Sequence, residues 1–202
     1  SYVNEVTDSK DNERWSTGAD YIVELENRWV TTTSLTYLRE TYEIADEVDQ
    51  AELIIPGFQL SRVKANDPVY PSFGWRLSSM ARFANRNLSS TASFLQLNGN
   101  GKILFPLLGG RVLVRGDLGY TEVTNVRELP ASIRFFAGGD SSVRGFAYES
   151  LGPRADNGEV IGGRHLATGS LEYDHPITEK WHLAVFTDGG NAFNDFNDFE
   201  IR

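Results

Sequence analysis

Polar and apolar residues alternate with a period of two along most of this chain of 202 residues, and helical periodicity is hard to find. In the segment that begins at Trp15, odd positions carry residues such as Tyr21 and Leu25, whereas even positions carry Ser16 and Asp20. Successive side chains of a β-strand point to opposite faces of a sheet. The pattern therefore predicts strands with one apolar and one polar face.

Nine strands and the start of a tenth are expected from this alternation. They span residues 1–6, 14–26, 28–43, 55–66, 72–84, 91–107, 111–124, 162–175 and 180–190, with another opening near Phe199. Several of them exceed the ~5–6 residues that are usual for a strand in a globular sheet. They match the ~9–11 residues that a tilted strand needs to cross a bilayer.

The predicted connections alternate between short and long. Short turns fall near Asn27 and at 67–71, 106–110 and 175–179, and longer, more acidic links fall at 7–13, 44–54, 125–161 and 191–198. Outer-membrane barrels show this alternation, with short periplasmic turns and longer extracellular loops. The predicted fold is all-β: a partial transmembrane antiparallel β-barrel that occupies residues 1–202 as one domain.

Four aromatic residues favour the same interpretation. Trp29, Trp75 and Trp181 each follow a short turn, Phe105 precedes one, and all four lie on the apolar face of their strands. Such residues form the lipid-interface girdle of a membrane barrel. They would serve equally well as core side chains of a soluble β-sandwich, so the girdle alone does not choose between the two folds.

Composition narrows the classes of protein and of partner that are possible. The longest apolar stretches fall short of the ~18–20 residues of a membrane helix, while barrel strands keep the average hydropathy modest. Cysteine is absent, which excludes disulfides and thiolate metal sites. The net charge of −9 argues against a nucleic-acid partner. The chain begins at Ser1 without an initiator methionine or signal peptide, and we interpret it as a fragment of a longer protein.

The most informative segment is 134–152. It contains a Val-Arg-Gly-Phe tetrapeptide, formed by Val143, Arg144, Gly145 and Phe146, behind an Ala-Gly-Gly-Asp turn whose last three residues are Gly138, Gly139 and Asp140. Glycine permits backbone conformations that other residues avoid, and the arginine guanidinium is a planar fork of donors. An arginine in this setting is therefore expected to reach a charged partner from an unusual backbone geometry.

This motif resembles the signature of the Omp85 superfamily, together with the strand at 162–173 and Val-Phe-Thr-Asp-Gly-Gly at 185–190. The Arg-Phe-Phe-Ala-Gly-Gly-Asp start at Arg134 and the Arg-x-Leu-Ala-Thr-Gly-Ser-Leu-Glu-Tyr strand resemble the TamA subfamily more than the BamA subfamily. TamA-type proteins are the outer-membrane subunits of the translocation and assembly module. The specific resemblance covers about residues 130–190.

The resemblance implies a sixteen-stranded barrel in which the motif loop, at about 125–161, folds into the lumen between the eleventh and twelfth strands. Arg144 would meet Glu172 and Asp188 on the twelfth and thirteenth strands. The alternation independently places both carboxylates on the polar, inward face. By this count the chain spans the fifth strand to the opening fourteenth, and the POTRA domains and terminal strands lie outside it.

The resemblance also implies a function: insertion or translocation of other envelope proteins, such as autotransporters, in the outer membrane of a Gram-negative bacterium. The mechanism would be non-covalent, through the barrel seam and the lumen loop, so no catalytic residue, cofactor or metal ion is expected. The implied partners are outer-membrane lipid and lipopolysaccharide, nascent outer-membrane clients and a TamB-like protein anchored in the inner membrane. Alternatives are a BamA-type insertase, a two-partner secretion transporter and, from another class, a soluble carbohydrate-binding β-sandwich.

Other chemistries for the same residues find less support. Glu172 and Asp188 could form a glycosidase acid/base pair, but an arginine partner would lower both pKa values and spoil the general acid. His165 is expected to face outward and His182 inward, so a shared metal ion is not expected. The acidic links, at Asp46, Glu47, Asp49, Glu52, Asp195 and Asp198, are interpreted as a solvated outer face in preference to cation sites.

Overall fold

A computed structural model describes residues 2–7, 10–44, 47–178 and 180–201. Nine antiparallel strands form one sheet in chain order. They are β1 (Tyr2–Thr7), β2 (Lys10–Glu24), β3 (Val30–Ile44), β4 (Glu47–Ala65), β5 (Gly74–Ala84), β6 (Phe94–Leu107), β7 (Gly110–Val123), β8 (His165–Pro176) and β9 (His182–Phe193). The predicted all-β antiparallel fold is confirmed, and no helix in the described residues is long and apolar enough to cross a membrane.

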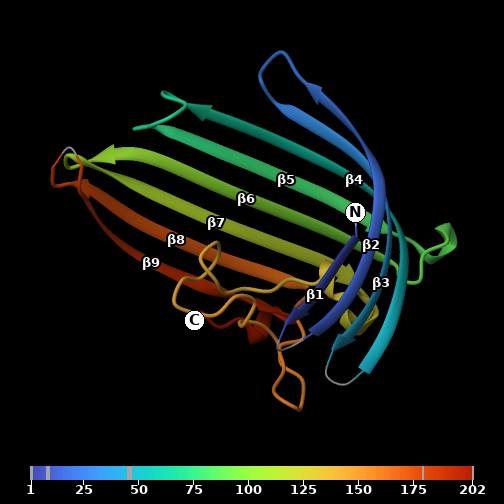
Figure 1. The fold of residues 1–202 in the computed structure, drawn as a ribbon. Coiled ribbons are helices and arrows are strands. Elements are labelled where there is room, and N and C mark those ends of the chain that lie inside the picture. Colours follow the sequence, from blue (N-terminus) through green and yellow to red (C-terminus); the bar gives the residue numbers. More distant parts are fainter. Residues whose placement is uncertain (1, 8–9, 45–46, 179, 202) are drawn as a thin grey trace.

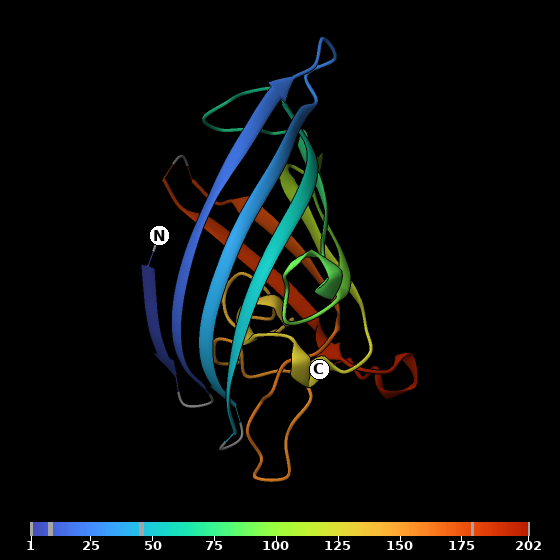
Figure 2. The same cartoon turned by 90° about the vertical axis from the view of Figure 1, so that its right-hand side faces the viewer.

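The sheet curls into a trough, with β1 and β9 as its two edges (Figures 1 and 2). The segment between β7 and β8, residues 124–164, is here called the loop segment. It lies on the concave side of the trough, apart from a hairpin that extends past the strand ends (Figures 1 and 2). The concave side therefore corresponds to the predicted lumen.

Strand register and the cavity lining confirm the polar face that the alternation predicts for β2 and β5. Asp20 lies opposite Ser34, Ser34 opposite Gly57, and Gly57 opposite Arg82 in successive strand pairs. Together with Ser132 of the loop segment, these residues line one cavity on the concave side. The polar set predicted from the alternation thus faces inward on these strands.

Two predicted loops are wrong. β2 begins at Lys10 and β4 at Glu47, so most of the expected links at 7–13 and 44–54 is strand. Their acidic residues suggested loops, but a ladder requires only backbone pairing, and Ile44 already lies opposite Glu47. Glu47, Asp49 and Glu52 therefore belong to β4, whereas Asp46 lies outside the described residues.

The other boundaries shift at the C-terminal end. β8 begins at His165 rather than at 162, because Gly163 forms a bridge with Phe135 of the loop segment instead. β9 continues to Phe193, beyond the predicted end at 190. The strand expected near Phe199 is not present in the described residues, where a 3₁₀-helix, Phe196–Asp198, is followed by irregular chain to 201.

An apolar core fills the concave side at the end where the loop segment lies. Leu53 of β4 and Leu129 of the loop segment are fully buried. The remaining buried members are Leu38, Tyr42, Ala51, Ile55, Ala84, Ala92, Phe94, Val123, Ala131, Ile133 and Ile161. This part of the inner face is apolar where the sequence suggested a polar lumen, because the loop segment packs on it and excludes water.

Candidate functional site: the arginine of the loop segment

The base of the loop segment is held by Arg134, whose side chain is buried at 7% exposure. Its guanidinium donates to three backbone carbonyls: Leu129 at 2.8 Å, Ile161 at 2.9 Å and Arg127 at 3.1 Å. Burial lowers the pKa of Arg134, although an arginine stays charged. One side chain therefore joins the two ends of the loop segment.

A second tie fixes the loop segment to the wall. Glu40 of β3, with no exposed surface, accepts hydrogen bonds from the backbone N–H and the hydroxyl of Ser132. Farther along the loop segment, Ala137 and Leu151 exchange both backbone hydrogen bonds, at 3.0 and 2.9 Å. The motif turn thus starts from a fixed stem.

The motif turn uses glycine where the backbone requires it. Gly138 and Gly145 have φ angles of 104° and 89°, which residues with a Cβ rarely adopt. A Cβ on Gly138 would also collide with the carbonyl oxygen of Ala147. The N–H of Gly139 donates to the carbonyl of Phe146 at 3.1 Å and closes the turn.

The two ends of the motif differ in exposure. Val143 is buried against Ala137 and Leu151 in a small apolar cluster, whereas Asp140 and Phe146 are exposed. Val143 therefore anchors the turn immediately before Arg144 and directs the arginine toward the wall.

Arg144 reaches two strands at once. Its Nη1 donates to Glu172 Oε2 of β8 at 2.7 Å, and its Nε donates to Asp188 Oδ2 of β9 at 2.7 Å. Nη2 adds bonds to Asp188 Oδ1 at 2.9 Å and to Ser170 Oγ at 3.1 Å. The backbone N–H of Arg144 also donates to Asp188 Oδ2 at 3.0 Å. The contacts expected between Arg144, Glu172 and Asp188 are all present.

Charge and geometry reinforce one another here. The bonds to Asp188 and then to Glu172 raise the pKa of Arg144 further above its usual range. Asp188 contributes both oxygens, a bidentate arrangement that suits a planar guanidinium and is stronger than a neutral hydrogen bond. With an arginine between them, the two carboxylates serve as anchors for the loop.

Three further residues at or next to the contacts of Arg144 were not predicted: Phe186, Ser170 and Arg115. The guanidinium carbon of Arg144 lies over the Phe186 ring, 3.5 Å from its centroid. Ser170 accepts a bond from Arg144, and Arg115 of β7 donates to the carbonyl of Ser142 at 3.3 Å. The position of Ser170 and Arg115 on the inward face of their strands could have suggested that they contact the loop. Phe186 escaped notice because it is an aromatic residue on a polar face.

The predicted girdle residues lie at the end of the sheet that carries the short turns. Trp29 precedes β3, Trp75 lies in β5 opposite Ile103, and Trp181 precedes β9 with 75% of its surface exposed. Arg62 of β4 lies over both Trp29 and Trp75, with 5.7 and 5.5 Å between its guanidinium carbon and the ring centroids. Their role at a lipid interface stays a prediction.

Phe105, the fourth girdle residue, lies in β6 opposite Val112, two residues before the strand ends at Leu107. It is partly exposed. It thus shares the short-turn end of the sheet with the three tryptophans.

The two strand histidines occupy different faces. His165 stacks against Tyr120 and Phe196, with centroid distances of 4.9 and 4.8 Å, and is buried beneath them. His182 instead contacts Asp174 at 2.9 Å on the concave side. The histidines are not brought together, and the described residues hold no cluster of three or more His, Asp or Glu side chains suited to a metal ion.

The concave side also carries a polar brace at the short-turn end, defined by Tyr70, Arg111, Asp174 and His182. Tyr70, in the turn between β4 and β5, lies over Arg111 at 4.3 Å and contacts His182 Nε2 at 3.3 Å. Arg111 binds Asp174 at 2.7 Å and the carbonyl of Pro71 at 3.2 Å. The turn is therefore tied to β7, β8 and β9, which the sequence did not predict.

A curved antiparallel wall and an inward-folded loop anchored by its arginine define a class of β-barrel proteins. The chain belongs to the Omp85 superfamily, because the model described as the Omp85 superfamily domain matches residues 4–200. Among solved structures, the fold is similar to that in the crystal structure of BamA from Haemophilus ducreyi lacking POTRA domains 1–3, with a TM-score of 0.78 and 19% sequence identity. The match covers 92% of this chain and 42% of that one, so this chain spans less than half of that length.

Proposed function

We propose that this chain is part of an outer-membrane protein that assembles or translocates other envelope proteins, with a non-covalent mechanism of the TamA type. The observation that supports it most is the Arg144 cluster, formed by Arg144, Ser170, Glu172, Phe186 and Asp188. It holds the motif loop against the wall of an Omp85-type fold. The amino-acid sequence of the loop, Arg-Phe-Phe-Ala-Gly-Gly-Asp from Arg134, favours the TamA subfamily.

In this proposal the protein resides in the outer membrane of a Gram-negative bacterium, surrounded by lipid and lipopolysaccharide. Its clients are nascent outer-membrane proteins such as autotransporters, and its partner is a TamB-like protein anchored in the inner membrane. The chemistry of the Arg144 cluster agrees with a structural role, because its carboxylates are occupied by the arginine. The loop would brace the barrel from within while the barrel seam offers a strand edge to clients.

A BamA-type insertase is the second candidate, favoured by the fold similarity to BamA. The two differ in the partner they need and in the breadth of their clients. Co-purification of an inner-membrane-anchored partner after cross-linking, with loss of a subset of clients on deletion, would support the TamA type. Loss of all outer-membrane barrels on depletion would favour the BamA type instead.

Mutation of Arg144 tests the proposal directly. Arg144→Ala removes every side-chain contact that Arg144 makes with β8 and β9, so we expect lower client levels in the outer membrane and faster proteolytic cleavage near the exposed Tyr148. Arg144→Lys keeps the charge but loses the fork, and should resemble the alanine variant more than the wild type. Both measurements are made in a strain that lacks the chromosomal copy.

Arg154→Ala provides a matched control, because Arg154 belongs to the same loop segment and, within the described part of the chain, its exposed side chain donates only to the carbonyls of Gly158 and Ser150. It should leave client levels unchanged. Normal client levels in Arg144→Ala, with the variant present in the membrane at wild-type amount, would contradict the proposed role of the cluster.

A further inference from the structure

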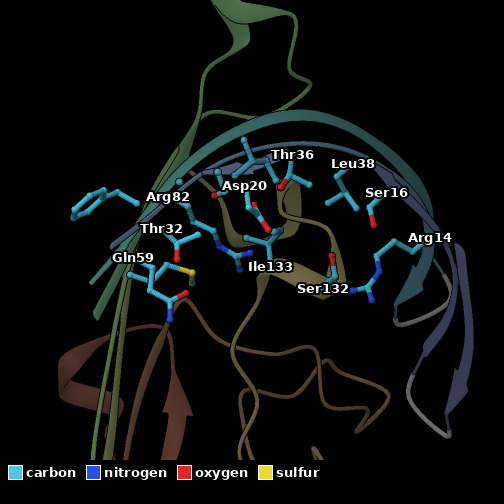
Figure 3. A pocket seen from close by; sticks show the side chains of 15 residues that line it. Arg14, Ser16, Asp20, Thr32, Thr36, Leu38, Gln59, Arg82, Ser132 and Ile133 are labelled. Atoms are coloured by element: carbon cyan, nitrogen blue, oxygen red, sulfur yellow. The ribbon is translucent and has the colours of Figure 1, made fainter. Parts of the chain in front are cut away.

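A cavity of about 320 Å³ lies on the concave wall, between β2–β5 and residues 132–133 of the loop segment (Figure 3). It is separate from the Arg144 cluster, which involves β8 and β9. Apolar side chains such as Leu38, Ile55 and Met80 line part of its wall, and hydroxyl groups line another part, contributed by Ser16, Thr32, Ser34, Thr36 and Ser132. Such a lining offers both hydrogen-bond donors and acceptors to a polar ligand.

Arg82 is positioned to serve this cavity. Its Nε donates to Gln96 Oε1 at 2.7 Å, and Gln96 is itself fully buried. The amide nitrogen of Gln96 donates to Thr121 Oγ1 and to the carbonyl of Ile133, both at 2.8 Å. Gln96 is therefore held rigidly, and it turns the outer nitrogens of Arg82 toward the cavity, as Figure 3 shows.

Among the described residues, no carboxylate lies within ion-pair distance of Arg82, and Gln96 is its one hydrogen-bond partner. A guanidinium withdrawn from water costs free energy unless an anion or several acceptors compensate it. Arg82 thus retains unused donors in a pre-organised position.

A carboxylate faces the same space from the far side. Asp20, Ser34, Gly57 and Arg82 lie opposite one another in successive strand pairs, so three strand spacings separate the backbones of Asp20 and Arg82. At the usual spacing this is about 14 Å. Both side chains project into the cavity (Figure 3), and no ion pair joins them in the described structure.

The remaining charged groups lie toward the loop segment. Arg14 lines the cavity near Ser132, and Glu40 lies opposite Arg14 in the register of β2 and β3. Glu40 is occupied by the N–H and hydroxyl of Ser132. The middle of the cavity is therefore left with a cationic end at Arg82, an anionic end at Asp20 and hydroxyls between them.

We propose that this cavity binds a small zwitterionic ligand, with an oxyanion at Arg82 and an ammonium group at Asp20. A carboxylate or a phosphate fits the fork of Arg82 equally well. The hydroxyls of Thr32, Ser34 and Thr36 line the space between the two charges. Gly57 contributes no side chain of its own, and the hydroxyl of Ser34, opposite it, lies where a Cβ would be.

Calorimetric titration of the intact protein in detergent tests the proposal, with O-phosphoethanolamine, γ-aminobutyrate and inorganic phosphate as probes. At least one zwitterion should bind saturably at one site, and the tighter of the two identifies the oxyanion. Arg82→Gln should weaken that binding at least about tenfold, the loss expected for a hydrogen bond to a charged group. Asp20→Asn should weaken the zwitterion while leaving phosphate unchanged.

Two further variants separate binding from folding. Gly57→Val would displace the hydroxyl of Ser34 and narrow the space between the two charges without altering either, and should weaken binding like Arg82→Gln. Arg76→Gln removes an arginine from the same strand outside the cavity lining and should bind as the wild type does. Absence of saturable binding for both zwitterions, or unchanged binding in the folded Arg82→Gln variant, would overturn the proposal.

Discussion

Arginine side chains hold the loop segment in place, and each acts through the geometry of its guanidinium. Arg144 bonds to three side chains on two strands, and Arg134 bonds to three backbone carbonyls. A lysine could supply the charge but not the planar fork. The identity of these residues is therefore set by the number and direction of the acceptors around them.

Arg134→Met tests this at the base of the loop segment. The substitution keeps a long apolar side chain but leaves the carbonyls of Leu129, Ile161 and Arg127 without their donor. Buried groups left unpaired cost free energy, so we expect the free energy of unfolding to fall by about 2–4 kcal/mol. Denaturant unfolding in detergent measures this. Equal stability of wild type and variant would mean that water replaces the lost donor.

At the residue scale, the sequence predicted the triangle of Arg144, Glu172 and Asp188 because a recognisable motif and the strand phase pointed to the same contact. It did not predict Phe186, since an apolar residue on the polar face breaks the alternation. The tie between Glu40 and Ser132 joins residues 92 positions apart, and no local pattern reports such a contact.

Strand β4 is the element whose extent the sequence misjudged most. Its first residues lie beyond the end of β5, where the link between β5 and β6 takes over as partner: Thr91 N–H donates to the carbonyl of Glu52 at 2.8 Å, and Ile54 N–H donates to Ser90 Oγ at 3.0 Å. Acidic composition predicted a loop, but these backbone bonds do not depend on side-chain charge.

Hydrogen exchange distinguishes the two descriptions of this element. If residues 48–54 are strand, their amides should exchange slowly, within about tenfold of those at 57–61, because both stretches are paired to β3. The exposed tip of the hairpin at 156–157 supplies a rapidly exchanging reference within the same molecule. Exchange at 48–54 as fast as in that hairpin would restore the predicted loop.

For the whole molecule, the alternation was enough to predict one antiparallel sheet in chain order, since each strand pairs with its sequence neighbour. It was not enough to predict what occupies the concave side. The apolar core around Leu53 and Leu129 and the polar brace around Tyr70 both depend on segments that cross the trough. Such contacts follow from curvature, which no single strand encodes.

The polar brace gives a prediction at this scale. Tyr70→Ala removes both the ring that covers Arg111 and the hydroxyl that contacts His182. We expect the turn at 66–73 to detach from β7–β9 and its amides to exchange at least about tenfold faster, because loss of local contacts lowers the free energy of opening. Val69→Ala, at an exposed position in the same turn, is the control. Equal exchange in both variants would show that the brace does not hold the turn.

The brace and the core hold the two ends of the trough by different kinds of contact. At the short-turn end, one turn is held by the ring of Tyr70 over Arg111 and by the hydrogen bond from Arg111 to the carbonyl of Pro71. At the opposite end, apolar packing around Leu129 joins the loop segment to several strands. The short-turn end is therefore the easier of the two to open.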